Sequence, residues 1–225
     1  KTTTIFNLIE LEMEQGTSPD RIGYFAFTKK ASKEGRERTM ERFGLDEKEL
    51  PNFRTLHSLC YKMLGLSRQG VMNGSRYREF SDIMGMRLTG DSKMEEGSIS
   101  MLSKDDRLRF IEGLSRLRNV ELREQWHQHY DEDIDWHALD RFSNGLIQFK
   151  RARGLLDFTD MLSSCVEKEL SPKLEVMFVD EAQDLSPLQW QLVSVLAQNS
   201  ERVYIAGDDD QAIFRWAGAD VDHLV

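Results

Sequence analysis

Cysteine is scarce in this sequence of 225 residues, which contains only Cys60 and Cys165. Two cysteines are too few for a disulfide framework, so we interpret both as small packing residues of a protein in a reducing, cytoplasmic setting. Long apolar runs are absent too, since none approaches the roughly 18 residues of a membrane span, and no signal peptide is recognisable. The sequence therefore argues against a disulfide-rich secreted module and against a membrane protein.

A surplus of positive charge is also lacking, because the formal net charge is -9 at pH 7. This balance argues against a protein that coats duplex DNA by bulk electrostatics, but it leaves room for a local basic track. Residues 29–42 carry six basic side chains against three acidic ones. The run has two interpretations: a solvated helix face with pairs such as Glu34 and Arg38, or a surface that contacts nucleic acid.

The chain does contain alternating strand and helix patterns, interrupted by a long middle section. Apolar spacing predicts helices over 3–15, 30–43 and 56–64, an extended stretch near 53, and strands over 22–27, 175–179 and 202–206. Ser186, Pro187 and Gln189 form a start signal for one more helix. Strands that alternate with helices in this way predict an α/β fold with a parallel sheet.

Residues 66–150 contain no convincing strand and predict a mostly helical insertion in this fold. Ser103 begins a segment that resembles a capping box, and apolar residues follow it at helical spacing. The Trp-His-Gln-His cluster at 126–129, with His137 nearby, suggests a metal site, but its spacing matches no standard zinc motif. A solvated helix or loop is the simpler interpretation.

The most specific local pattern is a pair of adjacent carboxylates, Asp180 and Glu181, at the end of the apolar run 175–179. The crevice at the carboxyl ends of parallel strands is where α/β folds bind ligands. In a nucleotide hydrolase, Asp180 would hold Mg²⁺ and Glu181 would orient or deprotonate the attacking water. The alternative is that the pair only caps the turn into the next helix.

Two further segments fit phosphate chemistry. Residues 1–4, Lys-Thr-Thr-Thr, lead directly into a helical pattern and match the end of a phosphate-binding loop, whose Lys reaches phosphates and whose hydroxyl ligates Mg²⁺. Gln211 lies in a polar loop after the strand 202–206, where a glutamine can contact a γ-phosphate and its attacking water. Phe214 and Trp216 can stack on bases, although one of them could equally belong to the core.

Six segments together resemble the ordered motifs of the UvrD/PcrA/Rep family of superfamily 1 DNA helicases. They are Lys1-Thr2-Thr3 (the end of Walker A), Ala26-Phe27-Thr28-Lys29-Lys30-Ala31 (motif Ia), Thr55-Leu56-His57-Ser58-Leu59 (motif Ib), residues 156–162 (the D-F-x-D-L-L element), Asp180-Glu181-Ala182-Gln183-Asp184 (motif II) and residues 207–220 (motif III). They occur in the family's order and span nearly the whole chain. Ala217 departs from the pattern, because relatives usually carry Arg there.

The resemblance implies an ATP site. Five residues would bind ATP or its Mg²⁺: Lys1, Thr2, Thr3, Asp180 and Gln211. Thr2 and Asp180 would ligate the metal ion. Glu181 would be the catalytic base, with Asp180 and Gln211 as further catalytic residues, and Gln211 would couple the γ-phosphate to the DNA site.

The resemblance also implies a track for single-stranded DNA. Eight residues would contact the strand: Phe27, Thr28, Lys29, Thr55, His57, Ser58, Phe214 and Trp216. The first residues of the basic run that begins at Lys29 would then lie beside the DNA path. The implied partners are single-stranded DNA and its junctions with duplex DNA.

The implied fold is a RecA-like P-loop NTPase domain, formed by residues 1–65 and 151–225, with residues 66–150 as the helical insertion called 1B. The implied activity is ATP-driven movement along single-stranded DNA, 3′ to 5′, with duplex unwinding. Two alternatives remain open: a subunit of a RecB/AddA-like helicase–nuclease, and an ATP-gated DNA-binding switch that does not unwind. Both ends look cut, and the family completes its ATP site from a second RecA-like domain, so we expect these 225 residues alone not to hydrolyse ATP.

Overall fold

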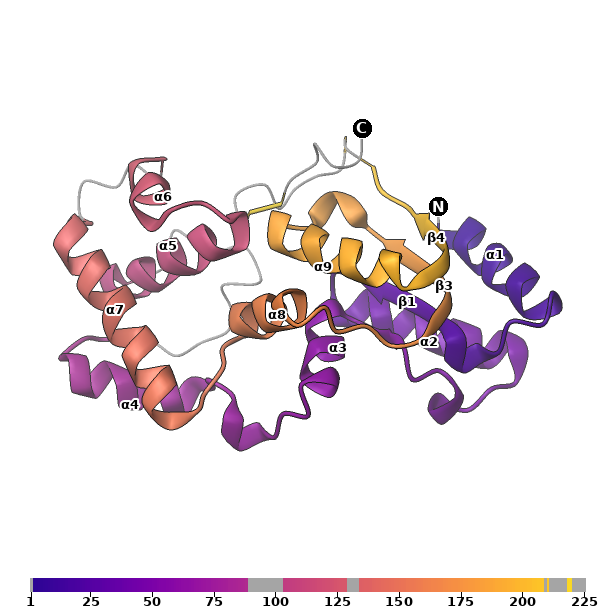
Figure 1. The fold of residues 1–225 in the computed structure, drawn as a ribbon, viewed down its shortest axis with the longest axis horizontal. Coiled ribbons are helices and arrows are strands. Elements are labelled where there is room, and N and C mark those ends of the chain that lie inside the picture. The colour runs from indigo at the N-terminus through magenta and orange to yellow at the C-terminus, as the bar shows by residue number, and fades with distance from the viewer. Residues whose placement is uncertain (1, 89–102, 129–133, 209, 211–217, 220–225) are drawn as a thin grey trace. The chain divides into compact units, whose positions relative to one another are not determined.

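The structure is a computed structural model that describes residues 2–88, 103–128, 134–208, 210 and 218–219. The chain divides into two compact units. The first, called here the sheet unit, comprises Lys1–Gly65 and Leu162–Val225, and the second, called the helical unit, comprises Leu66–Met161. Figure 1 shows the elements of both. Of the helices in the described ranges, none combines the length and apolarity needed to cross a lipid bilayer.

The sheet unit is built on four parallel strands: β1 Ile22–Ala26, β2 Phe53–Arg54, β3 Leu174–Asp180 and β4 Ser200–Ile205. Their order in the sheet is β2-β1-β3-β4. β1 is buried along its full length and β3 nearly so, as expected for apolar strands covered on both faces. The register pairs Ala26 with Asp180, so β1 and β3 end side by side. The predicted α/β fold with a parallel sheet is confirmed.

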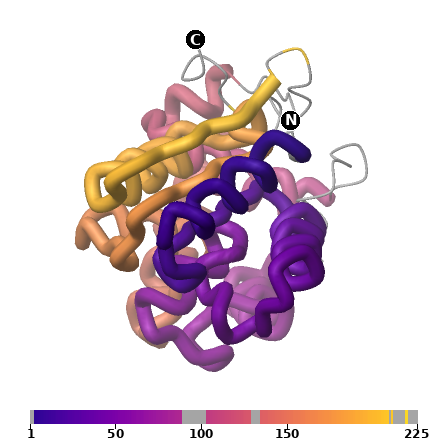
Figure 2. Tube along the Cα trace, turned by 90° about the vertical axis from the view of Figure 1, so that its right-hand side faces the viewer, coloured from indigo at the N-terminus to yellow at the C-terminus, as the bar shows by residue number. Residues whose placement is uncertain are grey.

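Helices α1 Thr2–Glu14 and α2 Lys29–Phe43 pack on one face of this sheet. Alternation along the strands turns every second side chain toward them. The buried residues that meet there include Ile5, Phe6, Ile9, Ile22, Tyr24, Val176 and Phe178. Figure 2 shows α1, in indigo, running alongside the sheet. This face of the sheet carries the tyrosine and the acid that form the centre of the candidate site.

Among the described residues, the sheet unit also contains α3 Leu56–Met63, α9 Pro187–Gln198 and the later part of α8 Phe158–Glu167. Short 3-10 turns occur at Pro19–Arg21, Glu47–Glu49 and Ala182–Asp184. Cys60 of α3 and Cys165 of α8 are free thiols with 0% exposure, which agrees with their interpretation as packing residues.

The start signal of α9 is present as the sequence predicts. The Ser186 N–H donates to Gln189 Oε1 at 2.8 Å, and the Gln189 N–H donates to Ser186 Oγ at 3.4 Å, with Pro187 in the first turn. These bonds satisfy N–H groups that have no partner inside the helix. Because Ser186 is only 3% exposed, water replaces the lost bonds poorly when the hydroxyl is removed.

We therefore expect Ser186→Ala to lower the free energy of unfolding by about 1–2 kcal/mol. The matched control is Ser194→Ala on the same helix, an exposed residue whose hydroxyl donates to the Trp190 carbonyl at 3.0 Å. The control should change stability by less than about 0.5 kcal/mol. Urea unfolding curves measure both variants, and equal losses would show that the cap is not the cause.

The helical unit contains α4 Gly74–Met84, α5 Lys104–Arg118, α6 Leu122–Gln128, α7 Trp136–Arg153 and the start of α8, together with a 3-10 turn at Arg68–Gly70. Ser103 caps α5, as predicted, by accepting a bond from the Asp106 N–H at 3.1 Å. Phe80 lies at the core, with its ring centroid 5.5 Å from that of Phe142 and 5.4 Å from that of Phe149. Extended pairing within the described part of this unit is limited to a bridge between Val71 and Leu156.

The compact helical unit continues to Met161, whereas the sequence placed the end of the insertion at residue 150. The reason is a buried ion-pair network that joins residues 157 and 160 to α5 and α7. The histidine cluster at 126–129 lies partly outside the described residues. Trp126 is accounted for, since its indole N–H donates to the Ile134 carbonyl at 2.8 Å.

Candidate active site

The two acids that follow the apolar part of β3 lie where the parallel strands stop. Asp180 is 4% exposed, and its carboxylate accepts a bond from the Tyr24 hydroxyl at Oδ2 (2.7 Å) and one from the Glu181 N–H at Oδ1 (3.0 Å). Burial raises the pKa of Asp180 above its usual value, the Tyr24 bond opposes this rise, and the Glu181 carboxylate adds to it. The pair is a concentrated negative charge that a bound cation would stabilise.

Glu181 adopts a left-handed backbone conformation, with φ 54° and ψ 43°. Residues other than glycine seldom occupy this region, and such backbone strain gathers at functional sites. The turn that follows is tied to the neighbouring strand, because the Ala182 N–H donates to the Ala206 carbonyl at 3.0 Å. The local fold thus turns the chain sharply just after Asp180 and fixes where the Glu181 side chain begins.

Gln183 joins the acid pair to the loop after β4. Its Nε2 donates to Glu181 Oε2 at 2.6 Å, and its Oε1 accepts from the Asp208 N–H at 2.9 Å. The side chain is 2% exposed, so both bonds lie in a dry environment. Sequence reasoning quoted Gln183 within a motif but missed this bridge. The signal that the sequence offered was the position of this polar residue, which follows two acids and precedes a buried helix.

Asp184 adds a third carboxylate to this region. Burial, with a contribution from the Glu181 carboxylate, raises the pKa of Asp184 to about 6. Its Oδ1 is buried and has no hydrogen-bond partner among the residues that the structure describes. A buried oxygen without a partner in a native fold calls for an explanation, such as a bound water or ion.

The oxygen donors present fit Mg²⁺, which proteins commonly bind through one or two carboxylates plus water and substrate phosphates. Each Asp180 oxygen accepts one hydrogen bond and so keeps a lone pair for the cation or its water. No cluster of three or more His, Cys, Asp or Glu side chains within the described ranges could hold a metal ion. Phosphate and water would therefore have to complete the coordination.

A pocket of about 140 Å³ opens beside the acids. Its lining comes from α1, β1, α2 and the end of β3, and includes Phe6, Tyr24, Gly35, Arg38, Asp180 and Glu181. Burial, with the Asp180 carboxylate close by, raises the pKa of Tyr24 well above its usual range. The tyrosine therefore keeps its proton and acts as a hydrogen-bond donor in this wall.

The structure describes only some of the other residues assigned to ATP. α1 begins at Thr2, so its first turn directly follows Lys1, and Thr3 is exposed. Lys1, Gln211, Phe214 and Trp216 lie outside the described residues, and the side chain of Thr2 is not described either. The structure thus describes the side chains of Asp180 and Glu181, and the role of all these residues in binding ATP stays a prediction.

Two of the segments assigned to DNA come from neighbouring strands. Phe27, Thr28 and Lys29 follow β1, whereas Thr55, His57 and Ser58 follow β2, and the register pairs Phe25 with Arg54. Both threonines cap helices, since Thr28 accepts from the Ala31 N–H at 3.1 Å and Thr55 accepts from the Ser58 N–H at 3.2 Å. Thr55 is buried, whereas Thr28, Lys29 and Ser58 are exposed.

Arg54 is a cation near this surface that sequence reasoning missed. It is half-buried, and its Nη1 reaches Ser58 Oγ at 3.5 Å. Burial lowers its pKa, and the nearby Arg36 adds to this effect; burial and Arg54 in turn lower the pKa of Lys62. The Glu47 carboxylate, which pairs with Arg36 at 2.6 Å, partly offsets this effect on Arg54.

The later part of the basic run behaves as the simpler interpretation predicts. Arg38 pairs with Glu34 at 2.5 Å and Lys33 pairs with Glu37 at 3.4 Å, all on the exposed face of α2. Surface pairs of this kind contribute at most about 1 kcal/mol each. Lys29, at the start of the run, is exposed as well.

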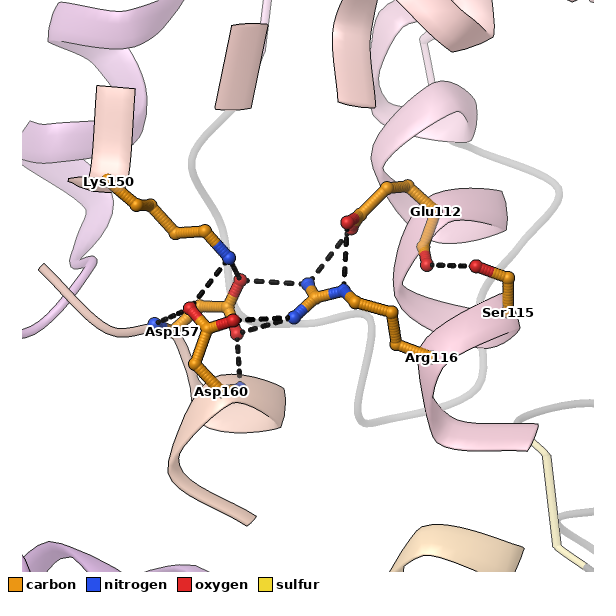
Figure 3. A network of polar contacts seen from close by, with 6 residues as sticks. All are labelled: Glu112, Ser115, Arg116, Lys150, Asp157 and Asp160. Carbon is orange, nitrogen blue, oxygen red and sulfur yellow. Dashed lines mark hydrogen bonds and ion pairs between the residues drawn. The ribbon is translucent and has the colours of Figure 1, made fainter. Parts of the chain in front are cut away.

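The D-F-x-D-L-L segment serves the helical unit as an anchor (Figure 3). Asp157 forms ion pairs with Arg116 (2.8 Å) and Lys150 (2.6 Å), and Asp160 pairs with the same two cations at 3.0 and 2.6 Å. Glu112 also pairs with Arg116, at 2.8 Å. Burial disfavours the charge on Asp157, yet the two cations hold its pKa below the usual range. Burial raises the pKa of Glu112.

Comparison with known proteins identifies relatives along almost the entire chain. The chain is 26% identical over 240 residues to a probable DNA helicase II homolog of Mycoplasma genitalium, with 97% of this chain and 33% of the relative covered. It is 27% identical over 226 residues to the ATP-dependent DNA helicase PcrA of Staphylococcus aureus, with 94% and 30% covered. For the putative ATP-dependent DNA helicase YjcD of Bacillus subtilis, the identity is 24% over 235 residues, with 93% and 28% covered.

The chain thus spans about a third or less of the length of these curated relatives. The family model of the UvrD/REP helicase N-terminal domain matches residues 1–225. With the acid pair at the end of a parallel strand and the motifs in their order, this match shows that the chain belongs to the UvrD/REP helicase family.

Proposed function

We propose that this chain is part of the motor of an ATP-dependent DNA helicase. In this proposal the sheet unit is the RecA-like domain and the helical unit is its 1B insertion. The observation that carries it is the placement of the assigned segments after the ends of four adjacent strands. The acids follow β3, the segments assigned to DNA follow β1 and β2, and Gln183 ties the acids to the loop after β4.

The acid pair performs the chemical work. Mg²⁺ held at Asp180, with Thr2 as a further ligand, would neutralise charge on the ATP phosphates. Glu181 takes the proton of the attacking water or orients that water, from a carboxylate whose position Gln183 fixes. Thr3 lies in the first turn of α1, and Lys1, which precedes α1 in the sequence, would bind the phosphates with it. Gln211 follows Asp208 by three residues in the sequence, close to the bridge that Gln183 makes.

The strand of DNA follows the ends of β1 and β2. Phe27, Lys29, His57 and Ser58 supply stacking and polar contacts, and Thr28 and Thr55 shape the two helix starts. Arg54 and Lys62 add positive charge near Ser58. Phe214 and Trp216 would stack on bases from the motif III loop. The curated names of the relatives, DNA helicase II and PcrA, support DNA as the substrate.

The test uses the full-length protein that contains this chain and measures ATP hydrolysis with and without single-stranded DNA. We expect the strand to raise the rate by about tenfold or more, equivalent to about 1.4 kcal/mol of barrier. Separation of a labelled duplex with a 3′ tail should accompany it. A hydrolysis rate that does not change when DNA is added would contradict the proposal. A stimulated rate without strand separation would favour the ATP-gated switch.

A further inference from the structure

We propose that Tyr24 is a positioning residue of the ATP site, whose hydroxyl orients the Asp180 carboxylate toward the metal ion. This inference rests on the proposed function, because it assumes that Asp180 holds Mg²⁺. Tyr24 lies within β1, outside the six motif segments, and no sequence pattern assigned it a role.

The first observation is the direction of the hydroxyl. Tyr24 and Asp180 are 156 residues apart in the chain, yet the hydroxyl donates to Oδ2 at 2.7 Å. Tyr24 pairs with Phe178, two residues before Asp180 on the neighbouring strand, so both side chains lie on the same face of the sheet. The tyrosine reaches along this face to the strand end. With the Glu181 N–H on Oδ1, both oxygens have a fixed donor.

The second observation is that the tyrosine ring has little freedom to move. Its centroid lies 6.1 Å from that of Phe6 and 5.5 Å from that of Phe53, both in stacked arrangements. On the α2 side it meets Gly35, where an added Cβ would lie 2.4 Å from the ring Cε1. Only glycine leaves room there. The 1% exposed ring is therefore clamped, and its hydroxyl is presented at one place.

The consequence is a preorganised metal ligand. A carboxylate with one donor on each oxygen cannot rotate without losing a buried hydrogen bond, and its remaining lone pairs keep one direction. Partners of this kind behind a metal ligand typically contribute about 10–100-fold in metal affinity. Tyr24 touches neither the phosphates nor the attacking water in this proposal, so its effect should appear as metal affinity.

The experiment compares Tyr24→Phe with Tyr204→Phe in the full-length protein. Tyr204 is the matched control, because its ring stacks on Phe178 at 5.0 Å while its hydroxyl bonds Glu12 at 3.2 Å, away from the acids. Mn²⁺ binding in the presence of ADP is followed by electron paramagnetic resonance, and ADP binding without metal is measured in parallel. Tyr24→Phe should weaken Mn²⁺ binding about 10–100-fold and leave metal-free ADP binding unchanged.

A second variant, Gly35→Ala, keeps the hydroxyl but displaces the ring, and it should weaken Mn²⁺ binding in the same way. Asp180→Asn tests the proposed metal site separately from the role of Tyr24. If Asp180→Asn abolishes Mn²⁺ binding while Tyr24→Phe binds like Tyr204→Phe, the role of Tyr24 is wrong and the proposed site stands. If Asp180→Asn leaves Mn²⁺ binding intact, the proposed metal site itself is wrong.

Discussion

Glu181→Gln should lower DNA-stimulated ATP hydrolysis by about 10²-fold or more while ATP still binds, because general-base catalysis typically contributes about 10²–10⁴-fold. The substitution removes the basic carboxylate and keeps the shape and the hydrogen bond of the side chain. The new amide oxygen can still accept the bond from Gln183 Nε2, which now reaches Glu181 Oε2 at 2.6 Å. The backbone turn at φ 54° is unchanged by a side chain of the same shape.

Steady-state turnover with saturating single-stranded DNA, together with the dissociation constant of a fluorescent ATP analogue, measures the two effects separately. The matched control is Glu37→Gln, which removes a carboxylate that pairs with Lys33 on the exposed face of α2 and leaves the acid pair intact. Its turnover should match that of the unchanged protein. Retention of turnover by Glu181→Gln within about threefold, or about 0.6 kcal/mol of barrier, would contradict the role of Glu181 as base.

Lys150→Met should lower the free energy of unfolding of the helical unit by about 3–5 kcal/mol, as expected when one partner of a buried ion pair is removed. Lys150 is 6% exposed, and its ammonium lies 2.6 Å from both Asp157 Oδ2 and Asp160 Oδ2. The network in Figure 3 holds two cations and three carboxylates. Without Lys150, the network drawn in Figure 3 would keep one cation, Arg116, against Glu112, Asp157 and Asp160.

The matched control is Arg76→Met, which removes a pair of similar length, 2.8 Å to Glu79, between side chains that are 39% and 37% exposed. It should cost about 0–1 kcal/mol. Urea unfolding at pH 7 compares them. In the unchanged protein the two cations hold the pKa of Asp157 below its usual value, so the stability that its charge contributes is lost as the pH falls below about 4, and the difference between the variant and the unchanged protein should shrink there. Equal losses of unfolding free energy in the two variants at pH 7 would contradict the stabilising role of the network.

Local signals predicted most of the sheet unit. The apolar runs of β1 and β3, and the Ser186 start of α9, are properties of a few consecutive residues, and each appears where the sequence placed it. The acids Asp180 and Glu181 could be found in the same way, because a carboxylate pair after an apolar strand is a local pattern.

Contacts between distant segments could not be predicted. The bond from Tyr24 to Asp180 depends on a pairing across 156 residues, which no short pattern contains. The continuation of the helical unit to Met161 depends on Arg116 and Lys150 reaching Asp157, from helices that precede it by 41 and 7 residues. The left-handed backbone of Glu181 was also invisible, because a glutamate ordinarily predicts a right-handed or extended conformation.

The bridge between Val71 and Leu156 has a consequence for how the chain reaches this fold. Pairing of β1 with β3 must close a loop of roughly 150 residues, a step that is entropically unfavourable and slow in parallel sheets. The Met72 N–H donates to the Leu156 carbonyl at 2.9 Å, and the Leu156 N–H donates to the Gly70 carbonyl at 3.0 Å, so the entry and exit of the helical unit lie side by side. Once this unit has folded, the loop is effectively short. We therefore expect the insertion to form first and to act as an internal template that brings β3 to β1 as the polypeptide leaves the ribosome.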